Sequence, residues 1–494
     1  MYKETLSKDL NKLVSVEAAV RLTAKPMTAI GLAAIFLAIV WVAANAITAG
    51  AENQGFIVAA GVIGGYMALN IGANDDANNV GPAFGAKSLT MVGALVIAAI
   101  FESAGAFIAG GDVVKTISQD IIDPSLMPDT KIFIWTMMSA LLAAALWINF
   151  ATWVGAPVST THSIVGGVIG AGIAAAGFAI VNWGVMGKIA VSWVISPVLG
   201  GIIAALFLAF VKSHIIYQPD KVAAAKRWVP VLVALMAGIF TSYLMMKGLK
   251  KVWKPGPETV TLIGVIVFAV TWSIVRPLIA RRAEGMENRN KSIRSLFHLP
   301  LICAAALLSF AHGANDVANA VGPLAAIVSS AETGAIAAQV EIPPWVLFVG
   351  AVGITMGLLL FGPKLIRTVG TQITRMNPMR AYCVALSAAV TVIVASALGL
   401  PVSSTHIAIG AIFGVGFYRE WQTARRTHIN HGRIQKAPQT PSEWDLLPPL
   451  EKAQRRKLVR RQHLWTIVAA WLITVPLSAI LAGGIFFVMR ALLG

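Results

Sequence analysis

A polar sequence occurs twice in an otherwise apolar chain. Residues 72–82 read GANDDANNVGP and residues 313–323 read GANDVANAVGP, which are identical at nine of eleven positions. Each copy precedes a second shared motif, GAPVSTTH at 155–162 and GLPVSSTH at 399–406. Because two motifs recur together and in the same order, the chain contains an internal duplication.

The distance between the two motifs is nearly the same in both copies. It is 84 residues from Asp75 to Ser159 and 87 residues from Asp316 to Ser403. Both copies keep carboxylates, amides and hydroxyls amid apolar sequence. This pattern is typical of a transporter whose binding site lies between two halves.

The composition is that of a membrane protein. Hydrophobic residues make up 57% of the chain and charged residues 12%, whereas a soluble domain carries about 25% charged residues. A membrane-spanning helix needs about 20 apolar residues, so we predict an all-α polytopic membrane protein with about 10–12 transmembrane helices. Ten stretches are clear candidates: 28–48, 88–109, 132–151, 163–181, 185–211, 230–246, 259–280, 345–362, 381–398 and 464–489.

The net charge of +17 lies mostly in loops. Basic residues cluster in the N-terminal segment and in the loops 212–227, 276–294 and 419–461. An excess of Lys and Arg in cytoplasmic loops explains this distribution, so we expect no nucleic-acid partner. The lysines between 247 and 254 do not fit, because the predicted topology places their loop outside.

The basic loops set the orientation of the two copies. With the N-terminus in the cytoplasm, the first copy begins outside near residue 55 and the second begins inside near residue 298, which predicts two inverted-topology repeats. The predicted units are a cytoplasmic amphipathic lead-in (1–27), an extra transmembrane helix (28–48), repeat 1 (55–212), a connector helix pair (228–280), repeat 2 (298–418), a basic cytoplasmic loop (419–463) and the final helix of repeat 2 (464–490).

The duplicated pair of motifs, GAND-x-AN-x-VGP and PVS-[ST]-TH, resembles the inorganic phosphate transporter (PiT) family, which contains sodium- and proton-coupled phosphate symporters. The resemblance covers residues 55–212 and 298–490 and rests on motifs that are specific in combination. It implies a bacterial inner-membrane symporter that forms a homodimer and imports phosphate by alternating access.

The residue types of the motifs fit this expectation. Glycine and proline disfavour continuous helices, so we predict broken helices at the membrane midplane, where they line a protein-enclosed cavity. The PVS segments predict helix N-termini, which bind anions. The residues expected at the phosphate are Ser159, Thr160, Thr161, Asn78, Ser403, Ser404, Thr405 and Asn319.

Neither motif contains Arg or Lys, although a buried anion needs charge compensation. Helix N-termini supply only about half a charge each, so cations are expected to bind beside the anion. The residues predicted to bind the coupling ion, Na⁺ or H⁺, are Asn74, Asp75, Asn315, Asp316 and Glu102.

Sodium is favoured over protons, because amide oxygens coordinate metal ions but do not titrate. For a sodium ion, the expected ligands are the Asp and Asn side chains of Asp75, Asn74, Asp316 and Asn315. Glu102 aligns with a glutamate that matters in sodium-coupled relatives, and its second-half companion there aligns with Ala385. We expect no cofactor other than the coupling ion.

Several alternatives stay open. Asp76 faces Val317 in the other copy, so its role is undecided. His162 and His406 fit either a ligand or a histidine bonded to a helix turn. A sulfate or other oxyanion permease is the alternative substrate class. An anion channel is less favoured, because enclosed carboxylates suit alternating access better than an open pore, and no nucleophile–base pair indicates an enzyme.

Overall fold

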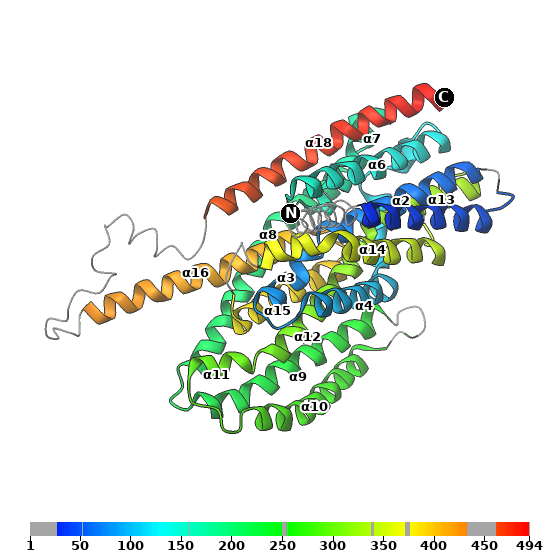
Figure 1. Cartoon of the computed structure of the whole chain (residues 1–494). Helices are drawn as coiled ribbons and strands as arrows, with labels where there is room; N and C mark the ends of the chain where they lie inside the picture. Colours follow the sequence, from blue (N-terminus) through cyan, green and yellow to red (C-terminus); the bar gives the residue numbers. More distant parts are fainter. Residues whose placement is uncertain are drawn as a thin grey trace, which may run out of the picture.

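The computed structural model of the chain describes residues 27–51, 53–156, 158–248, 253, 255–336, 340–370, 376–431 and 461–493. These residues form helices and loops, with no β-strand among them (Figure 1). Eleven of their helices are long and apolar enough to cross a membrane. The predicted all-α polytopic membrane fold is therefore confirmed. The lead-in 1–27 lies outside the described residues except for Met27.

The helices follow the order of the predicted units. The extra span is the helix Met27–Ile47. The first half contains α2 (Gln54–Asn74), α3 (Ala77–Gly85), α4 (Met91–Ala109), α5 (Gly111–Lys115), α6 (Thr130–Val154), α7 (Thr160–Ala176), α8 (Trp183–Val211) and the short π-helical turn η4 (Lys212–Ile216). The helix pair is α9 (Lys221–Lys247) and α10 (Pro257–Arg282), followed by α11 (Asn290–Ser295). The second half contains α12 (His298–Asp316), α13 (Ala318–Thr333), α14 (Pro344–Thr368), α15 (Pro378–Ala397), α16 (Ser404–His431) and α18 (Arg461–Leu493).

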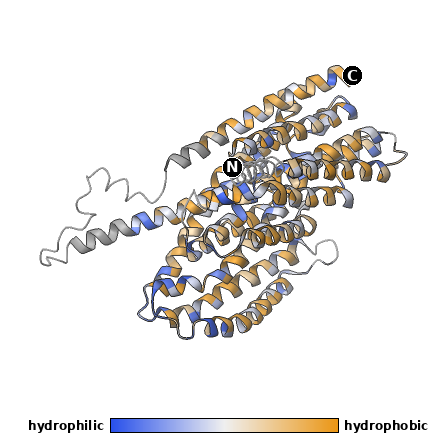
Figure 2. Cartoon of the chain, viewed as in Figure 1, coloured by the Kyte–Doolittle hydropathy of each residue, from blue (hydrophilic) through white to orange (hydrophobic). Residues whose placement is uncertain are grey.

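The helices differ in how much of their surface is buried. Most residues of α2, α6, α13 and α15 are buried, whereas α10 and the helix Met27–Ile47 expose large apolar side chains over most of their length. Hydrophobic residues cover most of the helical surface, and hydrophilic residues collect mainly at helix ends and in loops (Figure 2). In a bilayer, such exposed apolar helices face lipid, so the inner helices are the ones that position a site.

The two halves exchange helices in their packing. Helix α2 packs against α14 of the other half, and α12 packs against α4 in the same way. Likewise, α7 packs against α18 and α16 against α8. Ser103 of α4 and Thr355 of α14 lie 2.7 Å apart at corresponding positions. This reciprocal packing is what two halves related by a two-fold rotation produce; the inverted orientation in the membrane stays a prediction.

Glycines permit the closest of these contacts. A Cβ atom at Gly72 would lie 1.9 Å from the carbonyl oxygen of Ile354, and one at Gly313 would lie 2.1 Å from that of Glu102. Both distances are far below van der Waals contact. The glycines of the GAND motifs therefore allow helix backbones to approach across the two halves.

This finding corrects the expectation that glycine and proline break the helices. Gly72 lies inside α2, and Pro82 lies inside α3. The interruption falls instead at Asp75 and Asp76 in the first half and at Val317 in the second. Asp75 and Asp76 keep right-handed helical dihedral angles, so each break is a local change of hydrogen bonding and not a large bend.

Two predicted boundaries are also wrong. The apolar stretch 163–181 holds only the 17-residue helix α7, because Gly177 ends the helix with a φ of +80°. The predicted loop 419–463 begins as helix, since α16 continues to His431. Residues 419–431 contain neither Gly nor Pro, and the first proline comes at 438. Residues 432–460 lie outside the described part of the chain.

The glycine contacts generate a stability prediction. A Cβ atom at Gly357 of α14 would lie 1.9 Å from the carbonyl oxygen of Leu69. We expect Gly357→Ala to cost at least about 1–3 kcal/mol, because a backbone cannot yield as a side chain can. The melting temperature of the purified protein in detergent should fall clearly.

The matched control is Gly187→Ala on α8, where an added Cβ atom has nothing within 4 Å. Its melting temperature should stay within error of the wild type. Equal melting of both variants would contradict the close-packing explanation.

Candidate functional site

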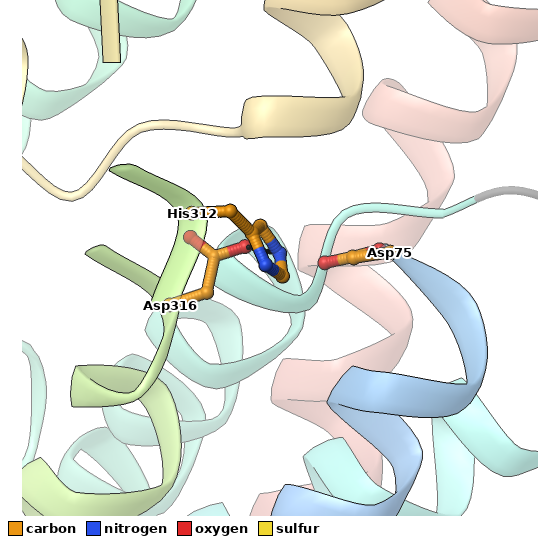
Figure 3. Close-up of side chains that lie close together, drawn as sticks. All are labelled: Asp75, His312 and Asp316. Carbon is orange, nitrogen blue, oxygen red and sulfur yellow. Dashed lines mark ion pairs between the residues drawn. The ribbon is translucent and has the colours of Figure 1, made fainter. Parts of the chain in front are cut away.

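Two buried aspartates lie at the interruptions of the motif helices. Asp75 follows the last residue of α2, and Asp316 is the last residue of α12. Their exposed fractions are 2% and 0%. The side chains of Asp75 and Asp316 approach His312, which lies one turn before Asp316 on α12 (Figure 3). The polar atoms of these three residues all lie within 4.8 Å of one another.

Hydroxyl groups of the second motifs donate to these carboxylates. Thr160 Oγ1 donates to Asp75 Oδ2 at 2.7 Å, and its counterpart Ser404 donates to Asp316 Oδ2 at 3.2 Å. Thr405 of the other half also donates to Asp75, at 3.3 Å. Asp75 is therefore held by both halves at once.

The first-motif asparagines reach across to the opposite half. Asn78 Nδ2 donates to Thr405 Oγ1 at 2.9 Å, and Asn319 Nδ2 lies 3.2 Å from both Thr160 Oγ1 and Thr161 Oγ1. All of these side chains are buried. The structure thus brings together the residues that the sequence predicted for phosphate, although they come from four helices.

The helices α7 and α16 begin at this place. Ser159 caps α7, since its Oγ accepts from the backbone N–H of His162 at 3.1 Å. Ser403 does the same for His406 at 3.3 Å. Two helix N-termini with hydroxyl-bearing first turns therefore face the two aspartates, as the PVS segments predicted.

Asn74 and Asn315 hold the loops that precede these helices. Asn74 Nδ2 donates to Thr152 Oγ1 at 2.9 Å, and Asn74 Oδ1 accepts from the backbone N–H of Val158 at 3.3 Å. Asn315 contacts the corresponding Ser396 Oγ at 2.8 Å. With its amide turned over, Asn315 would accept from Ser396 and donate to Asp316 Oδ1 at 3.0 Å. Both amides therefore position a loop, a function that the sequence analysis did not assign to them.

His312 is the site residue that the sequence analysis missed. Its Nε2 lies 2.8 Å from Asp316 Oδ2, and its Nδ1 lies 3.3 Å from Asp76 Oδ1 and 3.2 Å from Glu102 Oε1. Asn79 Nδ2 donates to the same Glu102 oxygen at 2.8 Å. One imidazole thus links the carboxylates of both halves.

The cluster around His312 has no polar equivalent in the other half. The duplicated motifs align His312 with Ile71, Asp76 with Val317 and Asn79 with Ala320. Gly72 and Gly313 contact Ile354 and Glu102, so Ile354 is the counterpart of Glu102. The four counterparts, Ile71, Val317, Ala320 and Ile354, are buried apolar side chains.

This correspondence corrects the comparison of Glu102 with Ala385. Ala385 lies on α15, whereas the helix that corresponds to α4 in the packing is α14. The apolar residue at 385 therefore says nothing about a partner for Glu102. The relevant position is Ile354, which is also apolar.

His162 and His406 lie near the site but contact each other and not the aspartates. Their rings are 4.8 Å apart, edge to face, and His162 also stacks on Trp193 of α8 at 3.7 Å. His162 Nδ1 lies 2.7 Å from Ser159 Oγ. Trp193 Nε1 donates to the carbonyl of Pro401 at 2.9 Å, so these rings pack the two helix N-termini together.

Comparisons with known proteins agree with this arrangement. The model of the Phosphate transporter family matches residues 71–482. A Helicobacter pylori (strain J99) protein with the provisional name phosphate permease is 43% identical over 526 residues, covering 97% of this chain and 98% of that protein. A Pyrococcus abyssi (strain GE5) protein with the same provisional name is 34% identical over 430 residues, covering 87% and 96%.

A solved structure is also similar. It is described as the sodium-dependent phosphate transporter and has a TM-score of 0.78 and 34% sequence identity, covering 89% of this chain and 100% of that chain. These matches span nearly all of the described helices, and they concern transporters and not enzymes. The chain therefore belongs to the phosphate transporter family.

Proposed function

We propose that this protein is a cation-coupled symporter that imports inorganic phosphate by alternating access. One observation carries the proposal: two capped helix N-termini, one from each half, face two buried aspartates at a single place. The helix ends suit an anion, and the aspartates suit cations. Sites of this composition are typical of secondary transporters with duplicated halves.

Phosphate is proposed to bind at the start of α7 and α16. Hydroxyls of Ser159, Thr160, Thr161, Ser403, Ser404 and Thr405 and the amides of Asn78 and Asn319 supply hydrogen-bond donors. Thr160 and Ser404 donate to the aspartates in this structure. A hydroxyl rotates freely about its C–O bond, so the same groups can turn to phosphate oxygens when cations occupy the aspartates.

The cations are proposed to bind at the aspartates. Asp75, Asp76, Glu102 and Asp316 are all buried, and an anion beside four carboxylates would be repelled unless positive charge binds with it. Asp75 and Asp316 offer carboxylate oxygens, with Asn74 and Asn315 next to them. Oxygen ligands of this type suit Na⁺, and the similar sodium-dependent phosphate transporter supports that ion.

Glu102 is proposed to act through the cluster around His312 and not at the Asp75 position. Its Oε1 accepts from Asn79 and lies beside His312, so it belongs to the one-sided part of the site. A protonated imidazole placed between Asp76, Glu102 and Asp316 offsets part of their negative charge.

Alternating access fits the burial of the site. Every residue proposed to bind phosphate has an exposed fraction of 3% or less. Because an ion in such a site reaches neither side freely, transport requires a conformational change, and this disfavours the anion-channel alternative. The inner-membrane location, the cytoplasmic N-terminus and the homodimer are proposed from the basic loops and the family resemblance.

The substrate choice between phosphate and another oxyanion rests on the family. Hydroxyl and amide donors bind any tetrahedral oxyanion, so competition experiments decide the matter. Excess unlabelled phosphate should block the uptake of radiolabelled phosphate, and excess sulfate should leave it nearly unchanged. Equal competition by sulfate would support a general oxyanion permease.

The aspartates give the first functional prediction. Asp75→Asn and Asp316→Asn should each reduce phosphate uptake into proteoliposomes at least about tenfold, since a lost interaction with a charged group costs about 1.5–3 kcal/mol. The matched control is Asp129→Asn, an exposed residue that caps α6. Asparagine caps helices as well as aspartate does, so its uptake should stay normal. Normal uptake by both site variants would remove the proposed cation role.

His312 gives the second prediction. His312→Gln keeps a polar side chain but removes the imidazole between the carboxylates of Asp76, Glu102 and Asp316. We expect uptake to fall by about tenfold or more, because a buried carboxylate that loses its partner is costly. His214→Gln, at an exposed histidine, should transport normally. If His312→Gln also transported at the wild-type rate, His312 would be a packing residue only.

The coupling ion gives the third prediction. Replacing external Na⁺ by choline at fixed pH should reduce phosphate uptake by proteoliposomes severely, and a protonophore should have little effect while Na⁺ is present. The opposite result, uptake that is unchanged in choline and lost with the protonophore, would assign the coupling to protons.

A further inference from the structure

A second cluster of charged residues lies away from the transport site. It surrounds a cavity of about 240 Å³ between η4, α11, the start of α15 and the later part of α16. Figure 1 shows α11 and the outer part of α16 toward the same end of the molecule. The polar lining residues are Lys212, Arg294, Arg380, Arg419, Asn290 and Asn377, together with the hydroxyl of Tyr217.

The cavity carries four positive charges and, among the described residues that line it, no carboxylate. Within the described part of the chain, neither Arg294 nor Arg380 forms an ion pair with an acidic side chain. Glu420 follows Arg419 on α16 but does not line the cavity. Four cations around one small space repel each other unless an anion lies between them, so the composition of the cavity points to an anionic ligand.

The surrounding structure holds these side chains toward the cavity. Lys212 donates to the side chain of Gln422 and lies 5.1 Å from the ring centre of Tyr418, both on α16. Asn377 caps α15 by accepting from the backbone N–H of Arg380 at 3.0 Å. The N-terminus of a 20-residue helix therefore adds its partial positive charge to the three guanidinium groups and the ammonium group.

This cavity is separate from the transport site. Arg419 follows Ser404 by fifteen residues on α16, a distance of about 22 Å along a helix. None of the cavity residues contributes to the hydrogen bonds around Asp75 or Asp316. The cavity therefore cannot be a second face of the same site.

We propose that this cavity binds a phosphate group, either of free orthophosphate or of an anionic lipid headgroup. Arginine side chains bind phosphate oxygens in pairs, and three arginines with one lysine suit a multiply charged oxyanion. The basic loops place this end of the molecule in the cytoplasm, where both sources of the group are present.

The position of the cavity has a mechanical consequence. Helices α8, α15 and α16 each run from the cavity to the transport site: α8 carries Trp193, α15 leads to the loop before Ser403, and α16 begins with Ser404. A Cβ atom at Gly414 would lie 2.0 Å from the carbonyl oxygen of Gly201, so α8 and α16 are in backbone contact. An anion that bridges all three helices restrains their movement relative to one another.

The test measures thermal stabilisation of the purified full-length protein in nanodiscs. Wild type in neutral-lipid discs is titrated with orthophosphate in sodium-free buffer, with chloride at equal ionic strength as the reference. A second set of discs contains phosphatidylglycerol and no orthophosphate. The variants are Arg294→Gln/Arg380→Gln, the conservative Arg294→Lys/Arg380→Lys, and the control Arg289→Gln, whose side chain is exposed and pairs with Glu287.

We expect the glutamine pair to weaken the stabilising ligand at least about tenfold, since each lost charged hydrogen bond costs about 1.5–3 kcal/mol. The lysine pair should retain part of the effect, and the control should behave as wild type. Loss in the orthophosphate series identifies free phosphate, and loss in the phosphatidylglycerol discs identifies the lipid headgroup.

If the glutamine pair responds to both ligands as wild type does, the proposal is wrong. The lysine pair guards against a folding defect, because a variant that keeps the charges but loses all response would show that the cavity shape and not its ligand had been disturbed. This outcome would also overturn the proposal. The result is independent of the proposed transport mechanism, since no uptake is measured.

Discussion

The arrangement of the whole transport site depends on the burial of Asp75. This carboxylate accepts hydrogen bonds from Thr160 of its own half and from Thr405 of the other half. A carboxylate removed from water needs such donors, because an unpaired buried charge costs several kcal/mol, on the order estimated for isolated ions in apolar surroundings. To supply them, both second motifs must reach the same place, which requires the two halves to pack as closely as their glycines allow.

Glycine and the polar residues of the motif therefore serve one purpose in two ways. Gly72 and Gly313 allow backbones of opposite halves to touch, and this contact brings Asn78 and Asn319 within reach of the opposing threonines. Asn74 and Asn315 then hold the loops before α7 and α16. A larger residue at the glycine positions would separate the donors from the acceptors, even if every polar side chain were retained.

The sequence alone predicted the membrane fold, the motif residues and their convergence, because repetition in an apolar background marks polar residues as unusual. It did not identify His312, since repetition also hides whatever occurs only once: the other copy has Ile71 at that position. The interruption at Asp75 was predicted at the wrong residues, because glycine in a membrane helix signals close packing as often as a break. The length of α16 was missed because the charged sequence after 418 suggested a loop, although it lacks helix-breaking residues up to His431.

The one-sided cluster of Asp76, Asn79, Glu102 and His312 has a consequence for the energetics of transport. If the two halves are inverted and chemically identical, the outward- and inward-facing forms are related by symmetry and have equal free energy. Replacing Ile71, Val317, Ala320 and Ile354 on one side by four polar residues removes this degeneracy. The duplicated protein then has a ground state on one side of the membrane and an excited state on the other, so its resting orientation is written into four side chains.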